Sequence, residues 1–212
     1  MKKAAGQGQR GRGRPRCFDQ DAALERAMLL FWDRGYEATS LDELSAAMGI
    51  SPSSLYANFG GKEQLFRAAV DRYLARGGGH MDRILAEEPT ARGAVQRMIE
   101  TAVGEFTRPD QPSGCMIALA GTQCSPGARP LQDLMRGHRE AWHASLQARI
   151  QRAIEEGELA SGTDAAALAT FYVTVLLGMS VQARDGASPE SLRAAVDAAM
   201  RAWPGPGAPR GP

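Results

Sequence analysis

The sequence predicts an all-α protein, because its apolar residues recur at helical spacing and no stretch alternates as a β-strand does. Leu24, Ala27, Met28 and Phe31 follow at intervals that place them on one face of a helix. We find no run of alternating β-branched residues bounded by turn residues, so we expect almost no strand. Glycines and prolines divide the 212 residues into helices of ordinary length.

Residues with helix-start and helix-end chemistry define four helices in the first third of the chain. Gly35 suits a helix end, Ser51 suits an N-cap, and Pro52 suits a first helical position. Ser40 and Glu43 have the spacing of a capping box, and Thr39 and Asp42 offer the same spacing one residue earlier. The expected helices run from about Gln20 to Arg34, Leu41 to Met48, Pro52 to Phe59 and Lys62 to Arg76.

A larger helical region follows the glycines at 77–79. Two proline-containing segments, residues 107–114 and 125–130, interrupt it. Amphipathic spacing and N-caps predict helices over residues 95–106, 115–123, 131–156, 164–184 and 189–203. The glycine- and proline-rich ends lack the apolar residues that would let them order themselves.

The formal net charge of +1 is the sum of two unlike parts. Residues 1–16 carry six basic and no acidic side chains, so this arm has a charge of +6. In the remaining chain 19 basic residues face 24 acidic ones, which leaves a charge of −5. The charge therefore favours a nucleic-acid contact at one end of the chain. A hydrophobic content of 43% excludes a wholly disordered or collagen-like protein.

The cysteines point to a reducing environment. Cys17, Cys115 and Cys124 are an odd, sparse set, which is not a disulfide framework. No CxxC pair or Cys/His finger spacing is present, so we expect no zinc module, no resident metal and no cofactor. The basic N-terminus is not followed by an apolar stretch, so we expect no secretory signal and a cytoplasmic protein.

Residues 165–183 carry no formal charge and are long enough to test as a membrane span. The run contains polar residues such as Thr170, Ser180 and Gln182, and no symmetric aromatic and basic anchors flank it. We therefore expect no membrane association. A helix that is buried on most sides, in a subunit interface, explains the composition better.

The most informative stretch is residues 39–59, where two short helices are joined by a tight turn. Ser45 is small enough for the helices to cross closely, and Gly49 can adopt the left-handed conformation that the turn needs. The apolar Leu55 can pack back against the pair. These features, together with suitable N-cap residues at the start of both helices, are typical of a helix-turn-helix. The second helix of this motif enters the DNA major groove. A plain helical hairpin matches fewer of them.

Residues Phe18 to Arg72 resemble the DNA-binding domain of the TetR/AcrR family of bacterial transcriptional regulators. The similarity lies in the segment FWDRGYEATSLDELSAAMGISPSSLYANFGGKEQLF, above all in Gly35-Tyr36, Thr39-Ser40, Gly49, Leu55-Tyr56, Phe59, Lys62-Glu63 and Leu65-Phe66. The rest of the chain matches the family in helical character and length. The resemblance implies a homodimeric, ligand-responsive regulator, most often a repressor, with an N-terminal three-helix DNA-binding domain and a larger C-terminal helical domain.

Several hydroxyl, amide and basic side chains are candidates for DNA contact. Ser53, Ser54 and Asn58 lie on the exposed side of the expected third helix, where they can reach base edges, and an amide can bond adenine through two hydrogen bonds. Tyr56 and Lys62 are candidate phosphate contacts, the lysine by resemblance. Many family members have histidine in place of Asn58, so the operator sequence does not transfer from relatives. The predicted DNA-binding residues are Arg14, Arg16, Thr39, Ser40, Ser51, Ser53, Ser54, Tyr56, Asn58 and Lys62.

The basic arm offers a second contact with DNA. Arg14 and Arg16 lie in an Arg-Gly-Arg-Pro-Arg segment that is similar to the core of an AT-hook. Arginines on an extended segment fit a narrow minor groove, where the negative potential is greatest. The alternative is a solvated tail that adds only non-specific affinity.

We expect four segments: a basic arm (1–17), the helix-turn-helix domain (18–61), an effector-binding and dimerisation domain (62–203) and a tail (204–212).

We favour a hydrophobic organic compound as the effector of the third segment. A metal or thiol signal stays open, although Cys115 and Cys124 would lie on opposite faces of one helix. The candidate pocket residues are mostly apolar, with a few polar side chains among them. They are Met98, Phe106, Cys115, Met116, Leu119, Met135, His138, Trp142, Phe171, Tyr172 and Val175.

The sequence does not support an enzymatic function. No GxSxG, HExxH, P-loop or dinucleotide-binding glycine motif is present. We therefore expect a repressor that binds a palindromic double-stranded DNA operator as a homodimer and is released by a small effector. The rival hypothesis is a helical ligand-binding or interaction protein whose N-terminal module does not bind DNA.

Overall fold

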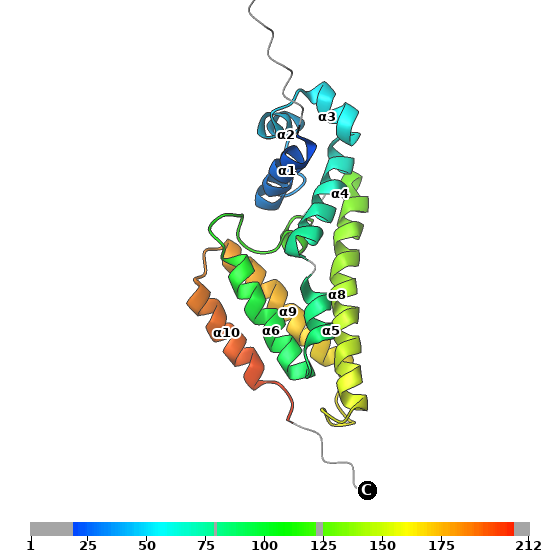
Figure 1. The fold of residues 1–212 in the computed structure, drawn as a ribbon, viewed down its shortest axis with the longest axis vertical. Helices are drawn as coiled ribbons and strands as arrows, with labels where there is room; N and C mark the ends of the chain where they lie inside the picture. Colours follow the sequence, from blue (N-terminus) through cyan, green and yellow to red (C-terminus); the bar gives the residue numbers. More distant parts are fainter. Residues whose placement is uncertain (1–18, 79, 122–124, 206–212) are drawn as a thin grey trace, which may run out of the picture.

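The computed structural model describes residues 19–78, 80–121 and 125–205 (Figure 1). Over these ranges the protein is built from helices and no strand forms, which confirms the predicted fold class. The α-helices are α1 (Gln20–Arg34), α2 (Leu41–Met48), α3 (Pro52–Phe59), α4 (Lys62–Tyr73), α5 (His80–Glu87), α6 (Ala91–Phe106), α7 (Met116–Leu119), α8 (Arg129–Glu155), α9 (Ala165–Arg184) and α10 (Pro189–Arg201).

The helix starts in the first third follow from the predicted caps. Ser40 accepts the N–H of Glu43 at 3.2 Å, while the Glu43 carboxylate accepts the N–H of Ser40 at 2.8 Å, so the capping box forms. These hydrogen bonds hold the pKa of Glu43 below its usual value. Ser51 caps α3 by accepting the N–H of Ser54. α1, α2 and α3 thus have the bounds that the sequence predicts.

The chain between α4 and α6 differs from the prediction. The sequence predicts that the fourth helix continues to about Arg76, but α4 ends at Tyr73. A short π-helical turn, Leu74–Gly78, follows it. Within this turn Gly77 has a φ of 149°, a conformation that favours glycine. The prediction missed α5, whose buried residues Met81, Ile84 and Leu85 span little more than one helical turn.

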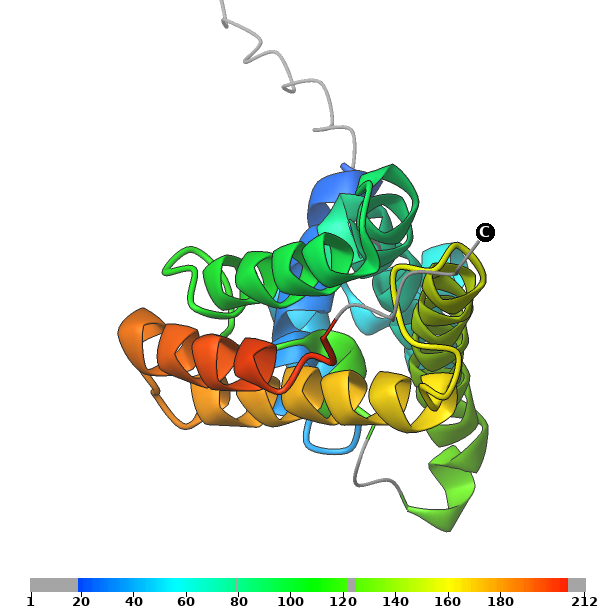
Figure 2. The ribbon, with the colours of Figure 1, turned by 90° about the horizontal axis from the view of Figure 1, so that it is seen from below.

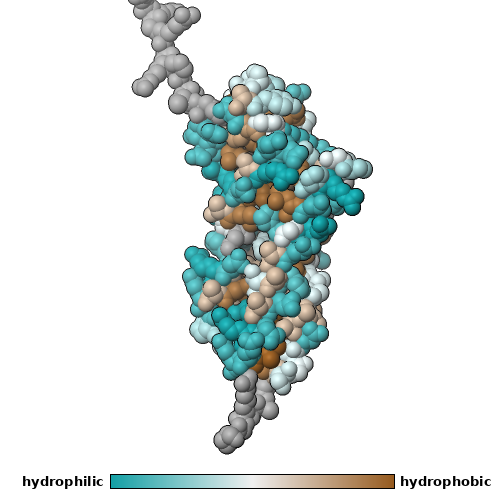
Figure 3. All heavy atoms as spheres, turned by 90° about the vertical axis from the view of Figure 1, so that its right-hand side faces the viewer, coloured by the Kyte–Doolittle hydropathy of each residue, from teal (hydrophilic) through white to brown (hydrophobic). Residues whose placement is uncertain are grey.

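The molecule has two parts stacked along its long axis (Figure 1). α1, α2 and α3 form a small bundle at one end, and α4 packs along α1 and leads into the second part. There α8 packs against α5 and α9, while α6, α9 and α10 lie side by side (Figure 2). On the face in Figure 3 hydrophilic residues are interspersed with separate hydrophobic patches.

A cluster of aromatic rings joins α1 to α4. Phe31 and Phe66 meet edge to face with ring centroids 5.1 Å apart, and Trp32 meets Tyr73 in the same way at 4.9 Å. All four residues are buried. Because Trp32 and Tyr73 also line a cavity described below, this cluster connects the small bundle with the second part of the molecule.

Among the described residues, α9 is the one helix whose length and composition would allow it to cross a membrane. The core or interface helix of a soluble protein has the same properties, and α9 packs against α6, α8 and α10. Only 39% of the residues in its most apolar window are buried, and its large apolar side chains Phe171 and Val181 are exposed.

Candidate DNA interface and effector cavity

The turn between α2 and α3 has the geometry of a helix-turn-helix. Gly49 has φ 71° and ψ 32°, the left-handed conformation that the sequence predicts. Ser45 is buried, and its carbonyl accepts the N–H of Ile50 at 3.0 Å. Leu55 is fully buried and anchors α3 to the bundle. The opposite face of α3 therefore remains open to solvent.

That open face carries hydroxyl and amide groups. Ser53 and Asn58 are exposed, and the hydroxyls of Ser53 and Ser54 each lie 2.9 Å from the Ser51 hydroxyl. The Asn58 amide donates to the carbonyl of Ser54 at 2.7 Å, which uses one of its two N–H groups and leaves the other N–H and the side-chain oxygen for further hydrogen bonds. These groups can donate and accept hydrogen bonds at base edges in a major groove.

Tyr56 lies next to these groups with its side chain at the surface. It is 54% exposed, an unusual position for a large ring, and its hydroxyl is free to reach a phosphate. The ring rests on the backbone between α3 and α4, since a Cβ on Gly61 would lie only 3.2 Å from Tyr56 Cε1. This glycine has φ 119°, so the chain turns into α4 with the ring folded over the turn.

Thr39 and Ser40, the two hydroxyl residues before α2, have different environments. Thr39 is fully buried, and its hydroxyl donates to the Gly35 carbonyl at 2.7 Å. This hydroxyl holds the turn after α1. A DNA contact by Thr39 stays a prediction. Ser40 is exposed at the N-terminus of α2, where hydroxyl and backbone groups can meet an anion.

Lys62 begins α4 beside the same surface. Its ammonium lies 4.2 Å from the centre of the Tyr36 ring, a cation–π contact. Partial burial lowers the pKa of Lys62, while the nearby carboxylates of Glu37 and Glu43 act in the opposite direction. The lysine is thus held close to the N-terminus of α4. Arg14 and Arg16 lie outside the described residues.

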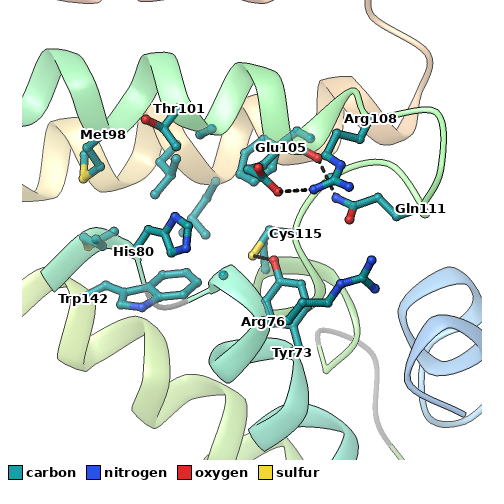
Figure 4. A pocket seen from close by; sticks show the side chains of 18 of the residues that line it. Tyr73, Arg76, His80, Met98, Thr101, Glu105, Arg108, Gln111, Cys115 and Trp142 are labelled. Carbon is teal, nitrogen blue, oxygen red and sulfur yellow. Dashed lines mark hydrogen bonds and ion pairs between the residues drawn. The ribbon is translucent and has the colours of Figure 1, made fainter. Parts of the chain in front are cut away.

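A cavity of about 100 Å³ lies between the two parts of the molecule, and most of its wall is apolar. Figure 4 shows its labelled polar side chains, with His80 and Trp142 at one end and Arg108 and Gln111 at the other. The residues that line it are Trp32, Tyr73, Arg76, Gly77, His80, Met81, Ile84, Met98, Thr101, Ala102, Glu105, Phe106, Arg108, Gln111, Gly114, Cys115, Ala118, Trp142, Leu176 and Leu177.

The structure brings four of the predicted pocket residues to this wall: Met98, Phe106, Cys115 and Trp142. The others do not line it. Of these, Met116 and Met135 are fully buried in the core, Tyr172 donates to the Ala199 carbonyl at 3.0 Å, and Phe171 is 41% exposed. Leu119, His138 and Val175 are partly buried elsewhere.

The polar groups of the cavity are held by local hydrogen bonds. The Tyr73 hydroxyl donates to the Cys115 sulfur at 3.3 Å, and burial raises the pKa of both side chains, so both are neutral near pH 7. Arg108 pairs with Asp110 at 2.6 Å and with Glu105 at 3.6 Å. Among the described residues, no group of three His, Cys, Asp or Glu side chains is arranged to hold a metal ion.

Sequence reasoning missed several wall residues, including Trp32, Tyr73 and His80. Trp32 and Tyr73 belong to α1 and α4, which pack against each other, and His80 begins the helix that was not predicted. The helical spacing of the apolar residues in the first helix could have indicated that Trp32 is buried. No signal in the sequence showed that this residue faces a cavity.

The fold and these surfaces define a class: an all-helical regulator with an N-terminal helix-turn-helix, a larger C-terminal helical domain and a cavity between the two parts. Residues 23–69 match the profile of bacterial regulatory proteins of the tetR family, and residues 91–199 match that of the tetracyclin repressor-like C-terminal domain. The chain belongs to the tetR family. It is therefore a DNA-binding regulator of transcription and not an enzyme, as the sequence predicts.

Relatives align over most of the chain. The HTH-type transcriptional repressor ComR of Escherichia coli (strain K12) is 37% identical over 196 residues, which are 92% of this chain and 93% of ComR. The repressor BdcR of the same strain is 28% identical over 180 residues, 85% of this chain and 86% of BdcR. A cysteine mutant of the TetR family regulator CifR, complexed with 26bp double-strand operator DNA, is 45% identical with a TM-score of 0.86, and the alignment covers 91% of this chain and 100% of that one.

Proposed function

We propose that this protein is a cytoplasmic, homodimeric repressor that binds a palindromic operator and is released by a small, mainly hydrophobic effector. One observation carries the proposal: α3 is anchored by the buried Leu55 and presents Ser53, Tyr56 and Asn58 to solvent. An exposed polar helix face on a helix-turn-helix is suited to base recognition. The similarity to CifR, whose structure contains operator DNA, supports the same role.

On the DNA, α3 lies in the major groove, where Ser53, Ser54 and Asn58 contact base edges. Tyr56, Ser40 and Lys62 contact the phosphates on either side and fix the position of α3. The Lys62 ammonium lies 4.2 Å from the centre of the Tyr36 ring, and it has three N–H donors with which to meet a phosphate. Ser51 holds the first turn of α3 in place by its hydrogen bonds to Ser53 and Ser54.

The basic arm adds affinity at the minor groove through Arg14 and Arg16. Removal of residues 1–16 deletes six positive charges. The slope of log affinity against log salt should fall by about 0.9 for each phosphate contact that is lost. An unchanged slope after truncation would show that the arm does not contact the operator.

Dimerisation involves α9 and α10, which lie side by side (Figure 2). Phe171 and Val181 of α9 are 41% and 48% exposed, and α10 exposes Ala194, Ala195 and Ala198. Apolar and small side chains on two adjacent helices favour a four-helix contact with a second copy. The two-fold axis of such a dimer matches the symmetry of a palindrome.

Effector release follows from the position of the cavity. Its wall includes Trp32 of α1 and Tyr73 of α4, so a ligand there touches the helices that support α3. A ligand that binds better to a second arrangement of these helices shifts the protein toward it. In that arrangement the two α3 helices no longer fit successive major grooves.

The test is a footprint on DNA upstream of the protein's own gene. We expect a protected palindrome whose half-sites are about one helical turn apart, or a multiple of it. The matched control carries Ser53→Ala and Asn58→Ala, which remove base contacts and leave the buried Leu55 in place. Protection that persists unchanged in this variant would refute the assigned role of α3. The rival, a ligand-binding protein that does not bind DNA, predicts no footprint at modest salt.

A further inference from the structure

The folded part of the DNA-binding end is acidic, although the proposed function brings it close to DNA phosphates. Residues 19–63 contain eight Asp and Glu side chains and three basic ones, which are Arg26, Arg34 and Lys62. Arg26 donates to a backbone carbonyl of α2 at 3.1 Å, and Arg34 pairs with Glu43 at 2.5 Å. Within this range, Lys62 is thus the basic side chain that these bonds leave for a phosphate.

The carboxylates whose charges act on Lys62 are bound to other groups. They belong to Glu37 and Glu43. Glu37 accepts the backbone N–H of Ser125 at 2.8 Å and its hydroxyl at 2.7 Å. Glu43 pairs with Arg34. Both carboxylates are thus engaged away from the ammonium, so its charge stays available to an anion.

The Lys62 ammonium lies over the Tyr36 ring, 4.2 Å from its centre. Two buried phenylalanines fix this ring, which stacks on Phe31 with centroids 6.2 Å apart and meets Phe66 edge to face at 5.3 Å. Lys62 is partly buried, and a cation gains more from a ring face when it is partly desolvated. A ring contact is electrostatic, so the ammonium keeps N–H groups for another acceptor.

From these observations we propose that Tyr36 is a positioning residue for operator binding, because its ring holds the Lys62 ammonium in place for a DNA phosphate before the protein meets DNA. The inference rests on the proposed function, since it explains how Lys62 comes to contact the phosphate backbone. A free lysine side chain loses conformational freedom when binding orders it, and this loss lowers affinity. A lysine that is already held loses less, so the ring strengthens binding without contacting DNA itself.

NMR of the full chain with labelled lysine tests whether the ring holds the ammonium in solution. The chain contains three lysines, Lys2, Lys3 and Lys62, so Lys62→Met identifies the Lys62 signal by its loss. Protons over the face of an aromatic ring are shifted upfield by the ring current. The ε-methylene protons of Lys62 should be shifted upfield in the wild type and in Tyr36→Phe, and the shift should disappear in Tyr36→Leu. An unshifted signal in the wild type would overturn the inference.

Fluorescence anisotropy with the footprinted operator measures the consequence for binding. Tyr36→Leu should weaken operator affinity about five-fold, the loss expected when one long side chain is ordered only on binding. Tyr36→Phe keeps the ring face, so its affinity should stay within about two-fold of the wild type. Lys62→Met should weaken binding and lower the slope of log affinity against log salt by about 0.9. Equal losses in Tyr36→Phe and Tyr36→Leu would show that the ring face is not responsible.

A double-mutant cycle separates positioning from a structural role of the ring. In Lys62→Met protein, Tyr36→Leu should cause no further loss of operator affinity, because the side chain that the ring positions is gone. The matched control uses Tyr56→Phe, which removes a different proposed phosphate contact. In that protein Tyr36→Leu should still weaken binding about five-fold. A five-fold loss in both proteins would show that the ring acts through the packing of the bundle, which would overturn the proposal.

Thermal unfolding shows whether Tyr36→Leu is folded at the assay temperature. If it is not, pentafluorophenylalanine in place of Tyr36 keeps the ring and reverses the charge distribution on its face. It should then show the loss of affinity that Tyr36→Phe does not, and equal affinities for these two proteins would overturn the proposal. If the wild type binds its operator and the cycle shows no coupling, the inference fails and the repressor assignment stands. If the wild type binds no operator at modest salt, the repressor assignment itself fails.

Discussion

Arg184 joins the end of α9 to the DNA-binding bundle, and its replacement gives a sharp prediction. The guanidinium donates to the carbonyls of Asp33 at 2.6 Å, Trp32 at 2.8 Å and Ser113 at 3.0 Å. Arg184→Met keeps an unbranched, flexible side chain that is shorter than arginine, and it removes all of these donors. The bonds lost cross between α9, the end of α1 and the segment before α7.

The expected loss of stability follows from these bonds. A hydrogen bond from a charged group contributes about 1.5–3 kcal/mol, but the Arg184 side chain is 27% exposed and water replaces part of each bond. We therefore expect Arg184→Met to lower the free energy of unfolding by about 3 kcal/mol in total. For a protein of this size the melting temperature should fall by roughly 6–12 °C.

Urea unfolding followed by circular dichroism, at fixed protein concentration, measures this loss. The control is Arg193→Met on α10, where the arginine is 61% exposed and pairs with Glu190, so we expect a change below about 0.5 kcal/mol. Because Arg184 connects α9 with α1, its variant should also bind the operator yet respond less to ligand. An Arg184→Met protein as stable as the control would refute the reasoning.

Three further outcomes follow from single residues. Gly49→Ala should lower the free energy of unfolding by about 1–2 kcal/mol in a urea titration, because a Cβ is strained at φ 71°; no loss would show that the turn relaxes. Ser40→Ala should cost about 1 kcal/mol in the same assay through the lost capping box with Glu43, whereas Asp42→Ala should cost less. Burial raises the pKa of Tyr172 to about 12, above the usual value near 10, so its contribution to stability is complete below pH 10 and is lost as the pH rises toward 12. Stability measured across this range should decline less in Tyr172→Phe, and identical declines would contradict the assignment.

Most of the fold was predictable because its signals are local. Ser40, Gly49 and Ser51 each act on residues within a few positions, so the caps and the turn can be read from neighbouring letters. α5 escaped prediction because a helix of eight residues after three glycines gives too short an apolar pattern. The short helix before residue 123 was also overextended, since α7 ends at Leu119.

The candidate sites also differ in how far the sequence predicts them, according to whether their residues are close together in the chain. The surface of α3 lies within one short hairpin, so its exposed residues follow from helical spacing once Leu55 is placed inside. Thr39 shows the limit, because helical spacing reveals neither its burial nor the hydrogen bond from its hydroxyl to the Gly35 carbonyl. The cavity depends on how distant helices pack together. Trp32 and Trp142 lie 110 positions apart in the sequence, and both line it.

The central claim is that the exposed face of α3 reads the operator sequence. Fluorescence anisotropy with the footprinted operator and a scrambled duplex of equal length, at one salt concentration, tests it directly. The wild type should bind the operator at least about 1,000-fold more tightly than the scrambled duplex. The variant with Ser53→Ala and Asn58→Ala should lose at least about ten-fold of that preference while its affinity for scrambled DNA stays the same. Equal affinity of the wild type for both duplexes would contradict the claim.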